Sequence, residues 1–124
     1  MIGYTTIGTR DMEKATAFYT ELLADMGCSL VLDGGRIAFI GKTLQEPCIA
    51  VCIPYDEKDP DPGNGNMIAL NPGSMEMVDK LHARALELGA TNDGDPGWRV
   101  EDVFYGGYFL DLDGNKVCFF QFGF

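Results

Sequence analysis

A strand, a capping residue and an amphipathic helix occur in that order twice along this chain, 63 positions apart. Residues 2 to 9 are expected to form a short strand, after which Asp11 caps a helix whose apolar residues recur at helical spacing. Residues 66 to 71 and Ser74 repeat the same order ahead of a second apolar stripe. The chain therefore contains two copies of one local unit.

Strand candidates follow each helix. In the first half they are residues 29–33, 35–41 and 48–53. In the second half an ill-defined stretch at 91–103 precedes a hairpin, whose turn is Asp113-Gly114-Asn115 and whose second strand is 116–122. We expect an α+β fold of two βαβββ modules within a single domain, residues 1–124. Module 1 covers about 1–54, residues 55–65 are a linker rich in proline and glycine, and module 2 covers about 66–124.

The chain is acidic. Its 124 residues carry 19 acidic and 9 basic side chains, a formal net charge of -10. Such a surface repels phosphate backbones and anionic membranes, and no apolar stretch is long enough to span a bilayer, so nucleic-acid and membrane partners are not expected. We expect a soluble, cytoplasmic protein.

Two loops concentrate the acidic residues. Residues 56–61 carry four carboxylates against one lysine, and residues 93–102 carry four around Arg99. Two readings remain open: both loops are simply solvated, or they form the rim of a cleft that favours a cationic ligand.

The four cysteines form no CxxC pair and have no companion histidine, so we expect free thiols that pack as small hydrophobes. The lone histidine, His82, is expected at the surface with no chemical role.

Three motifs carry a resemblance to a known family. They are D-x-x-x-A-x-x-F-Y-x-x-L-L at Asp11 to Leu23, G-N-G at Gly63 to Gly65, and D-x-D-G-N-K at Asp111 to Lys116. With the two βαβββ halves, the chain resembles the vicinal oxygen chelate superfamily, also described as the glyoxalase, bleomycin resistance and extradiol dioxygenase family. The resemblance implies a curved mixed sheet from each module, the two sheets enclosing a cavity, usually within a homodimer.

Metal-dependent members of this family hold a divalent ion with histidine, glutamate or glutamine from four strands. The resemblance places these positions at Tyr4, near Ala50, at Met67 and at Cys118. None of the four is a usual ligand, because alanine has no donor, a thioether is weak and a neutral phenol binds poorly. We therefore expect no metal and no cofactor.

Two other roles for Cys118 stay open. A soft-metal site could combine Cys118 and Met67 with Cys48 or Cys52, since sulfur ligands prefer Cu(I). Alternatively Cys118 could be a nucleophile whose pKa is lowered by Arg36, Arg99 or Lys116.

The resemblance and the aromatic residues together predict a metal-independent protein that binds a small molecule, with a cationic or aromatic ligand as the expected class. Phe104 is a further candidate wall, and the expected ligand-binding residues are Tyr4, Met67, Trp98, Tyr105, Tyr108, Cys118 and Phe120. The alternative is a lyase or dioxygenase-type enzyme of the same superfamily with a non-standard active site, in which Tyr4 and Cys118 perform acid-base work. Whether the protein is an enzyme is left open by the sequence.

Overall fold

The computed structural model describes residues 1–124, and they form two units, Met1–Pro62 and Gly63–Phe124. The boundary between the units falls within the expected linker at residues 55–65. Each unit is described by itself below.

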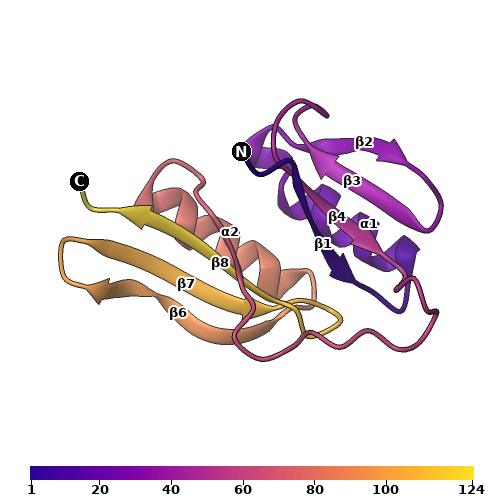
Figure 1. Ribbon diagram of the computed structural model, residues 1–124. Helices are drawn as coiled ribbons and strands as arrows, with labels where there is room; N and C mark the ends of the chain where they lie inside the picture. The colour runs from indigo at the N-terminus through magenta and orange to yellow at the C-terminus, as the bar shows by residue number, and fades with distance from the viewer. The chain divides into compact units, whose positions relative to one another are not determined.

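The first unit is a four-stranded mixed sheet with one α-helix (Figure 1). Its elements are β1 (Tyr4–Gly8), α1 (Met12–Leu22), the short 3-10 helix η1 (Ala24–Met26), β2 (Ser29–Asp33), β3 (Ile37–Gly41) and β4 (Cys48–Cys52). The strand order is β1-β4-β3-β2, with β1 parallel to β4 and the other pairs antiparallel.

The second unit repeats this design. Its elements are β5 (Ile68–Leu70), α2 (Met75–Glu87), β6 (Thr91–Val100), β7 (Phe104–Leu110) and β8 (Lys116–Phe122). The order β5-β8-β7-β6, with β5 parallel to β8, matches that of the first sheet. The predicted α+β class and the two βαβββ modules are confirmed.

Both helices begin at the predicted caps. The Asp11 side chain accepts a hydrogen bond from the backbone N–H of Lys14 at 3.0 Å, and the Ser74 side chain accepts one from Met77 at 3.1 Å. These side chains supply acceptors for N–H groups that have no partner within the helix. After each helix the chain turns at a glycine with positive φ, Gly27 at 80° and Gly89 at 107°.

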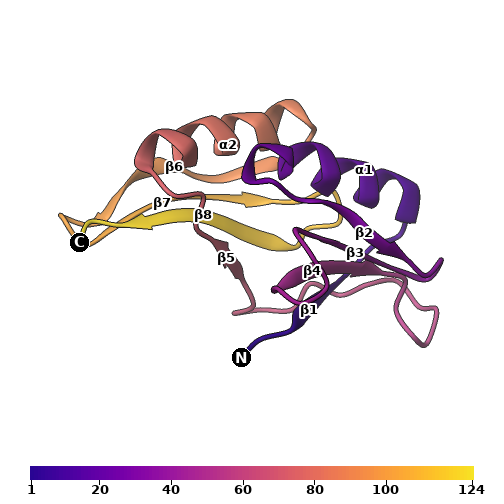
Figure 2. The same ribbon diagram turned by 90° about the horizontal axis from the view of Figure 1, so that it is seen from above.

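Each helix covers one face of the sheet in its own unit (Figure 2). In the first unit the buried side of α1 includes Phe18, Tyr19 and Leu22, and the buried strand residues include Ile40 and Val51. The core of the second unit is formed by Val78, Leu81, Ala85, Phe109, Val117 and Phe119. Neither α-helix is long and apolar enough to cross a membrane.

The prediction for His82 was wrong. This residue lies on the buried side of α2 and is only 3% exposed. Its Nε2 atom lies 3.1 Å from both Asn92 Oδ1 and the backbone oxygen of Tyr108, which are two acceptors. His82 therefore links α2 to β6 and β7. Its position was readable in the sequence, because Val78, Leu81, His82 and Ala85 share one helical face.

The predicted hairpin forms between β7 and β8. The Asp111 carboxylate accepts hydrogen bonds from the backbone N–H groups of Asp113 and Asn115, both at 2.9 Å, and Gly114 has φ +90°. The stretch at 91–103, which the sequence left undefined, contains β6, whose pairing with β7 has three irregularities.

Candidate functional site

The candidate site lies on the face of the second sheet that is turned away from α2, which we call the far face. Gly107 and Phe119 are paired in register and face α2, since a Cβ atom added at Gly107 would lie 3.0 Å from the His82 ring. Side chains alternate along a strand, so the neighbouring pair, Tyr108 and Cys118, belongs to the far face. Lys116 and Phe120 share it by the same alternation.

Cys118 lies at the centre of the far face. It is paired in register with Tyr108 on β7 and with Ala69 on β5, and it is 0% exposed. Burial raises the pKa of its thiol from 9.0 to about 11, although Arg99 and Lys116 act in the opposite direction. Only about one molecule in ten thousand would carry a thiolate at pH 7. A nucleophilic or metal-binding role at neutral pH is therefore disfavoured.

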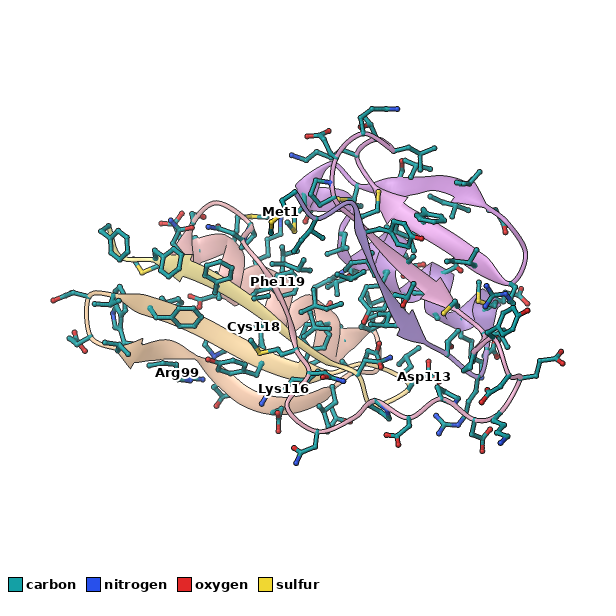
Figure 3. The ribbon with its side chains drawn as sticks, viewed as in Figure 1. Met1, Arg99, Asp113, Lys116, Cys118 and Phe119 are labelled. Carbon is teal, nitrogen blue, oxygen red and sulfur yellow. The ribbon has the colours of Figure 1, made fainter.

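Two cations flank the ring of Tyr108. The Arg99 guanidinium carbon lies 5.0 Å from the ring centroid and the Lys116 ammonium nitrogen lies 5.2 Å from it. Both distances fall within the range of cation–π contacts. Figure 3 shows Arg99 and Lys116 near Cys118. The centre of the far face is thus aromatic and neutral at its thiol, and at its edge lie Arg99 and Lys116, of which Lys116 pairs with Asp93 at 3.1 Å.

A stacked pair of phenylalanines borders Cys118 along β8. The rings of Phe104 and Phe120 are 5.3 Å apart and nearly parallel, with an interplanar angle of 1°. Phe122 extends the row by edge contacts with both. Between the stack and Cys118 lies Gly106, which is paired with Phe120 and presents no side chain. The Phe104 ring lies over the buried Gly106, and together with the Phe120 ring it forms an aromatic platform.

Two of the predicted ligand-binding residues lie on the opposite side of this sheet. Trp98 and Tyr105 are paired in register and their rings meet edge to face at 5.4 Å. The Tyr105 hydroxyl donates to Asp79 Oδ1 on α2 at 2.6 Å, and this hydrogen bond raises the pKa of Tyr105. The structure therefore brings Tyr108, Cys118 and Phe120 together, and separates Trp98 and Tyr105 from them.

Tyr4 and Ala50 belong to the first sheet. Ala50 is paired with Thr6 and with Phe39, and the Tyr4 ring meets the Phe39 ring edge-on at 4.8 Å. Tyr4 is half exposed, whereas Ala50 is fully buried. Met67, which directly precedes β5, is 43% exposed. Both Tyr4 and Met67 thus have accessible side chains.

The donor set at the predicted metal positions does not fit a divalent cation. Ala50 has no donor atom, and the Cys118 thiol is protonated at neutral pH. No group of three or more His, Cys, Asp or Glu side chains is placed to hold a metal ion anywhere in the chain. All four cysteines are free, as expected; Cys48 and Cys118 are buried, whereas the expected burial of Cys28 and Cys52 was wrong, since both are partly exposed.

An open groove, which no sequence motif indicated, lies on the first unit between α1 and β2. Its volume is about 600 Å³, and it contains none of the predicted site residues. The lining residues are Met12, Glu13, Thr16, Ala17, Thr20, Glu21, Leu30, Asp33 and Gly35. Its floor is apolar and its only charged side chains are carboxylates.

The fold is that of a known superfamily. The family model described as Glyoxalase/Bleomycin resistance protein/Dioxygenase superfamily matches residues 1–119. This chain belongs to that superfamily. No curated protein sequence matches the chain.

Solved structures agree with this assignment. A glyoxalase/bleomycin resistance protein from Albidiferax ferrireducens T118 is 27% identical, with a TM-score of 0.87 and 97% of each chain covered. A glyoxalase/bleomycin resistance protein/dioxygenase family enzyme from Burkholderia phytofirmans PsJN is 20% identical, with a TM-score of 0.76 and 95% of each chain covered. A hypothetical protein from S. aureus, SA1046, is 21% identical, with a TM-score of 0.74, covering 97% of this chain and 91% of the other. The last two likenesses concern the fold alone.

Proposed function

We propose that this protein binds a small aromatic molecule without a metal, and that the ligand lies on the far face of the second sheet. One observation carries this proposal. The position where metal-dependent relatives are expected to carry glutamate holds a buried, protonated Cys118, and an aromatic platform of Phe104 and Phe120 lies beside it. Such a surface can stack a planar ligand, but it offers no charged oxygen to a metal ion.

The alternative of an enzyme with acid-base chemistry at Cys118 is less well supported. A thiol with a pKa of about 11 is a poor general base at neutral pH, because almost none of it is deprotonated. No neighbouring base is placed to take up its proton. The hydrogen bond of its Sγ atom, 3.5 Å long, goes to the backbone oxygen of Phe119, which is not a base.

Metal analysis tests the first part of the proposal. Purified protein should contain nickel, zinc, manganese and iron well below one ion per chain. Its thermal unfolding midpoint should be the same with and without EDTA, because EDTA has no bound metal ion to remove. Near-stoichiometric metal that is lost on chelation, together with an activity, would contradict metal independence.

The second part is tested with an aromatic probe and a variant that disturbs the platform. A Cβ atom added at Gly106 would lie 2.8 Å from Phe104 Cε1, so Gly106→Ala should tilt that ring out of its stack with Phe120. Neutral 2-naphthamide should shift the backbone NMR signals of β7 and β8, and Gly106→Ala should weaken its binding by about threefold to tenfold.

Gly3→Ala is the control, because an added Cβ atom there meets nothing within 4 Å. It should bind the probe as the parent protein does. The placement on the far face is wrong if naphthamide moves signals elsewhere, or if the two glycine variants bind it equally.

A further inference from the structure

Two cations lie close to the centre of the far face, although the protein as a whole is acidic. The chain carries a net charge of -10, yet the two charged groups that flank Tyr108 are both cations. Their fields reach the centre of this face, since both lower the pKa of the Cys118 thiol against the larger effect of burial. A ligand carboxylate on this face therefore meets two cationic groups, one of which, Lys116, is also paired with Asp93.

The backbone holds the Arg99 guanidinium in place. Its Nη2 donates to the backbone oxygen of Asp95 at 2.6 Å, and its Nη1 donates to that of Gly97 at 3.3 Å. Glycines leave the space that it fills, because a Cβ atom at Gly94 would lie 3.2 Å from Nη2 and one at Gly97 would lie 3.4 Å from Nη1. The remaining N–H groups of this planar cation are available to a carboxylate.

Lys116 is also available to an incoming anion. Its Nζ atom pairs with Asp93 Oδ2 at 3.1 Å, but the lysine and aspartate side chains are 41% and 38% exposed. Ion pairs in such solvated positions are weak, so a ligand anion can compete for the lysine. The Asp95 carboxylate is held by Asn92, whose Nδ2 donates to Asp95 Oδ1 at 2.7 Å.

The geometry points to a planar aromatic carboxylate as the ligand class of the far face. Its ring would lie against the partly exposed rings of Phe104 and Phe120, and its carboxylate would lie between Arg99 and Lys116. The Cα atoms of Lys116 and Phe120 are roughly 13 Å apart along β8, which a bicyclic aromatic acid can bridge between side-chain ends. This inference rests on the proposed function above, and it reverses the cationic preference expected from the acidic loops.

Three probes that share one ring system test the charge preference: 2-naphthoate, neutral 2-naphthamide and cationic 2-naphthylmethylammonium. Affinities are measured by NMR titration of the labelled full-length chain. We expect naphthoate to bind about threefold to tenfold more tightly than naphthamide, and the ammonium compound to bind most weakly. The preference for naphthoate should shrink as salt is raised, because exposed charges are screened.

Arg99→Met and Lys116→Met should each reduce the preference for naphthoate over naphthamide, measured as the ratio of the two affinities within the same variant. Arg99→Lys should retain part of the preference for naphthoate, because the positive charge remains. Arg36→Met is the matched control, since Arg36 also donates to a backbone oxygen, that of Ile53 at 2.8 Å, and lies 5.6 Å from the ring centroid of Tyr55. That variant should keep the full preference, and unfolding midpoints confirm that each variant is folded.

The outcomes separate the inference from the proposed function. If all three probes shift the signals of β7 and β8 but the ammonium compound binds as tightly as naphthoate, the charge inference is wrong and the aromatic site stands. An equal loss of preference in Arg36→Met also overturns the inference, because the effect would then be one of overall charge. If none of the probes shifts those signals, the proposed site itself is wrong.

Discussion

Cys118 shows how a single side chain changes the chemistry of a site. A carboxylate at this position would be a negative metal ligand at neutral pH, whereas the buried thiol is neutral and its pKa is raised to about 11. Two cations lie close enough to oppose this shift, yet the cost of burying a thiolate exceeds their effect. The result is a buried, neutral side chain between Tyr108 and the phenylalanine platform.

Replacing Cys118 should change how stability depends on pH. The folded pKa of about 11 exceeds the ordinary value of 9.0, so the protonated thiol stabilises the folded state fully below pH 9, and this contribution is lost as the pH rises through 11. Between these values the free energy of unfolding should fall by about 2 to 3 kcal/mol more in the parent protein than in Cys118→Ala. Urea unfolding at a series of pH values measures the difference.

Comparing the two proteins isolates Cys118 from other groups that titrate in this range. The pKa values of Cys28 and Cys48 are also raised by burial, and that of Tyr105 by its hydrogen bond to Asp79, but these groups are present in both proteins. Parallel stability curves would mean that the Cys118 thiol is not protonated more strongly in the folded state.

At the scale of elements, the sequence predicted structure best where one side chain forms hydrogen bonds to the nearby backbone. Asp11, Ser74 and the Asp111 turn each do so through hydrogen bonds to nearby N–H groups, and all three features were predicted. Strand β6 was not defined, because Gly94, Pro96 and Gly97 interrupt the usual alternation. The bounds of β6 are set by its pairing with β7. At one end of this pairing Thr91 meets Leu110, a residue far from it in the sequence.

The two helix caps should contribute similar, measurable amounts to the free energy of unfolding. Asp11→Ala and Ser74→Ala each remove an acceptor for one N–H group at the start of α1 or α2, and each should lower the free energy of unfolding by about 1 kcal/mol. Asp11→Asn keeps an acceptor at the same place and should cost less. Urea unfolding checks the order, and equal losses in the alanine and asparagine variants would exclude the capping explanation.

At the scale of the whole molecule, exposed apolar side chains gather at one end of the second sheet. Val100, Val103 and Phe122 lie where β6 turns into β7 and where β8 ends, and Phe124 follows at the C-terminus (Figure 1). These side chains are 41% to 90% exposed. A cluster of this kind favours association with another apolar surface.

We expect this cluster to support the homodimer that the family resemblance suggests. Light scattering should give a mass near twice the 13.6 kDa of one chain. Phe122→Glu should shift the mass toward that of one chain, because a carboxylate would have to be desolvated in the interface. Leu44→Glu is the control, since Leu44 is comparably exposed but lies in the first unit. A monomeric parent protein would refute the expectation.

The amino-acid sequence by itself determined the two βαβββ modules, their capped helices and the β7–β8 hairpin, because each depends on residues close together in the chain. Only the tertiary structure decided which faces these residues share. Register placed Tyr108 with Cys118 and put Tyr105 on the opposite side. Packing also brought Arg99 and Lys116 to one aromatic ring, which local charge along the chain could not reveal.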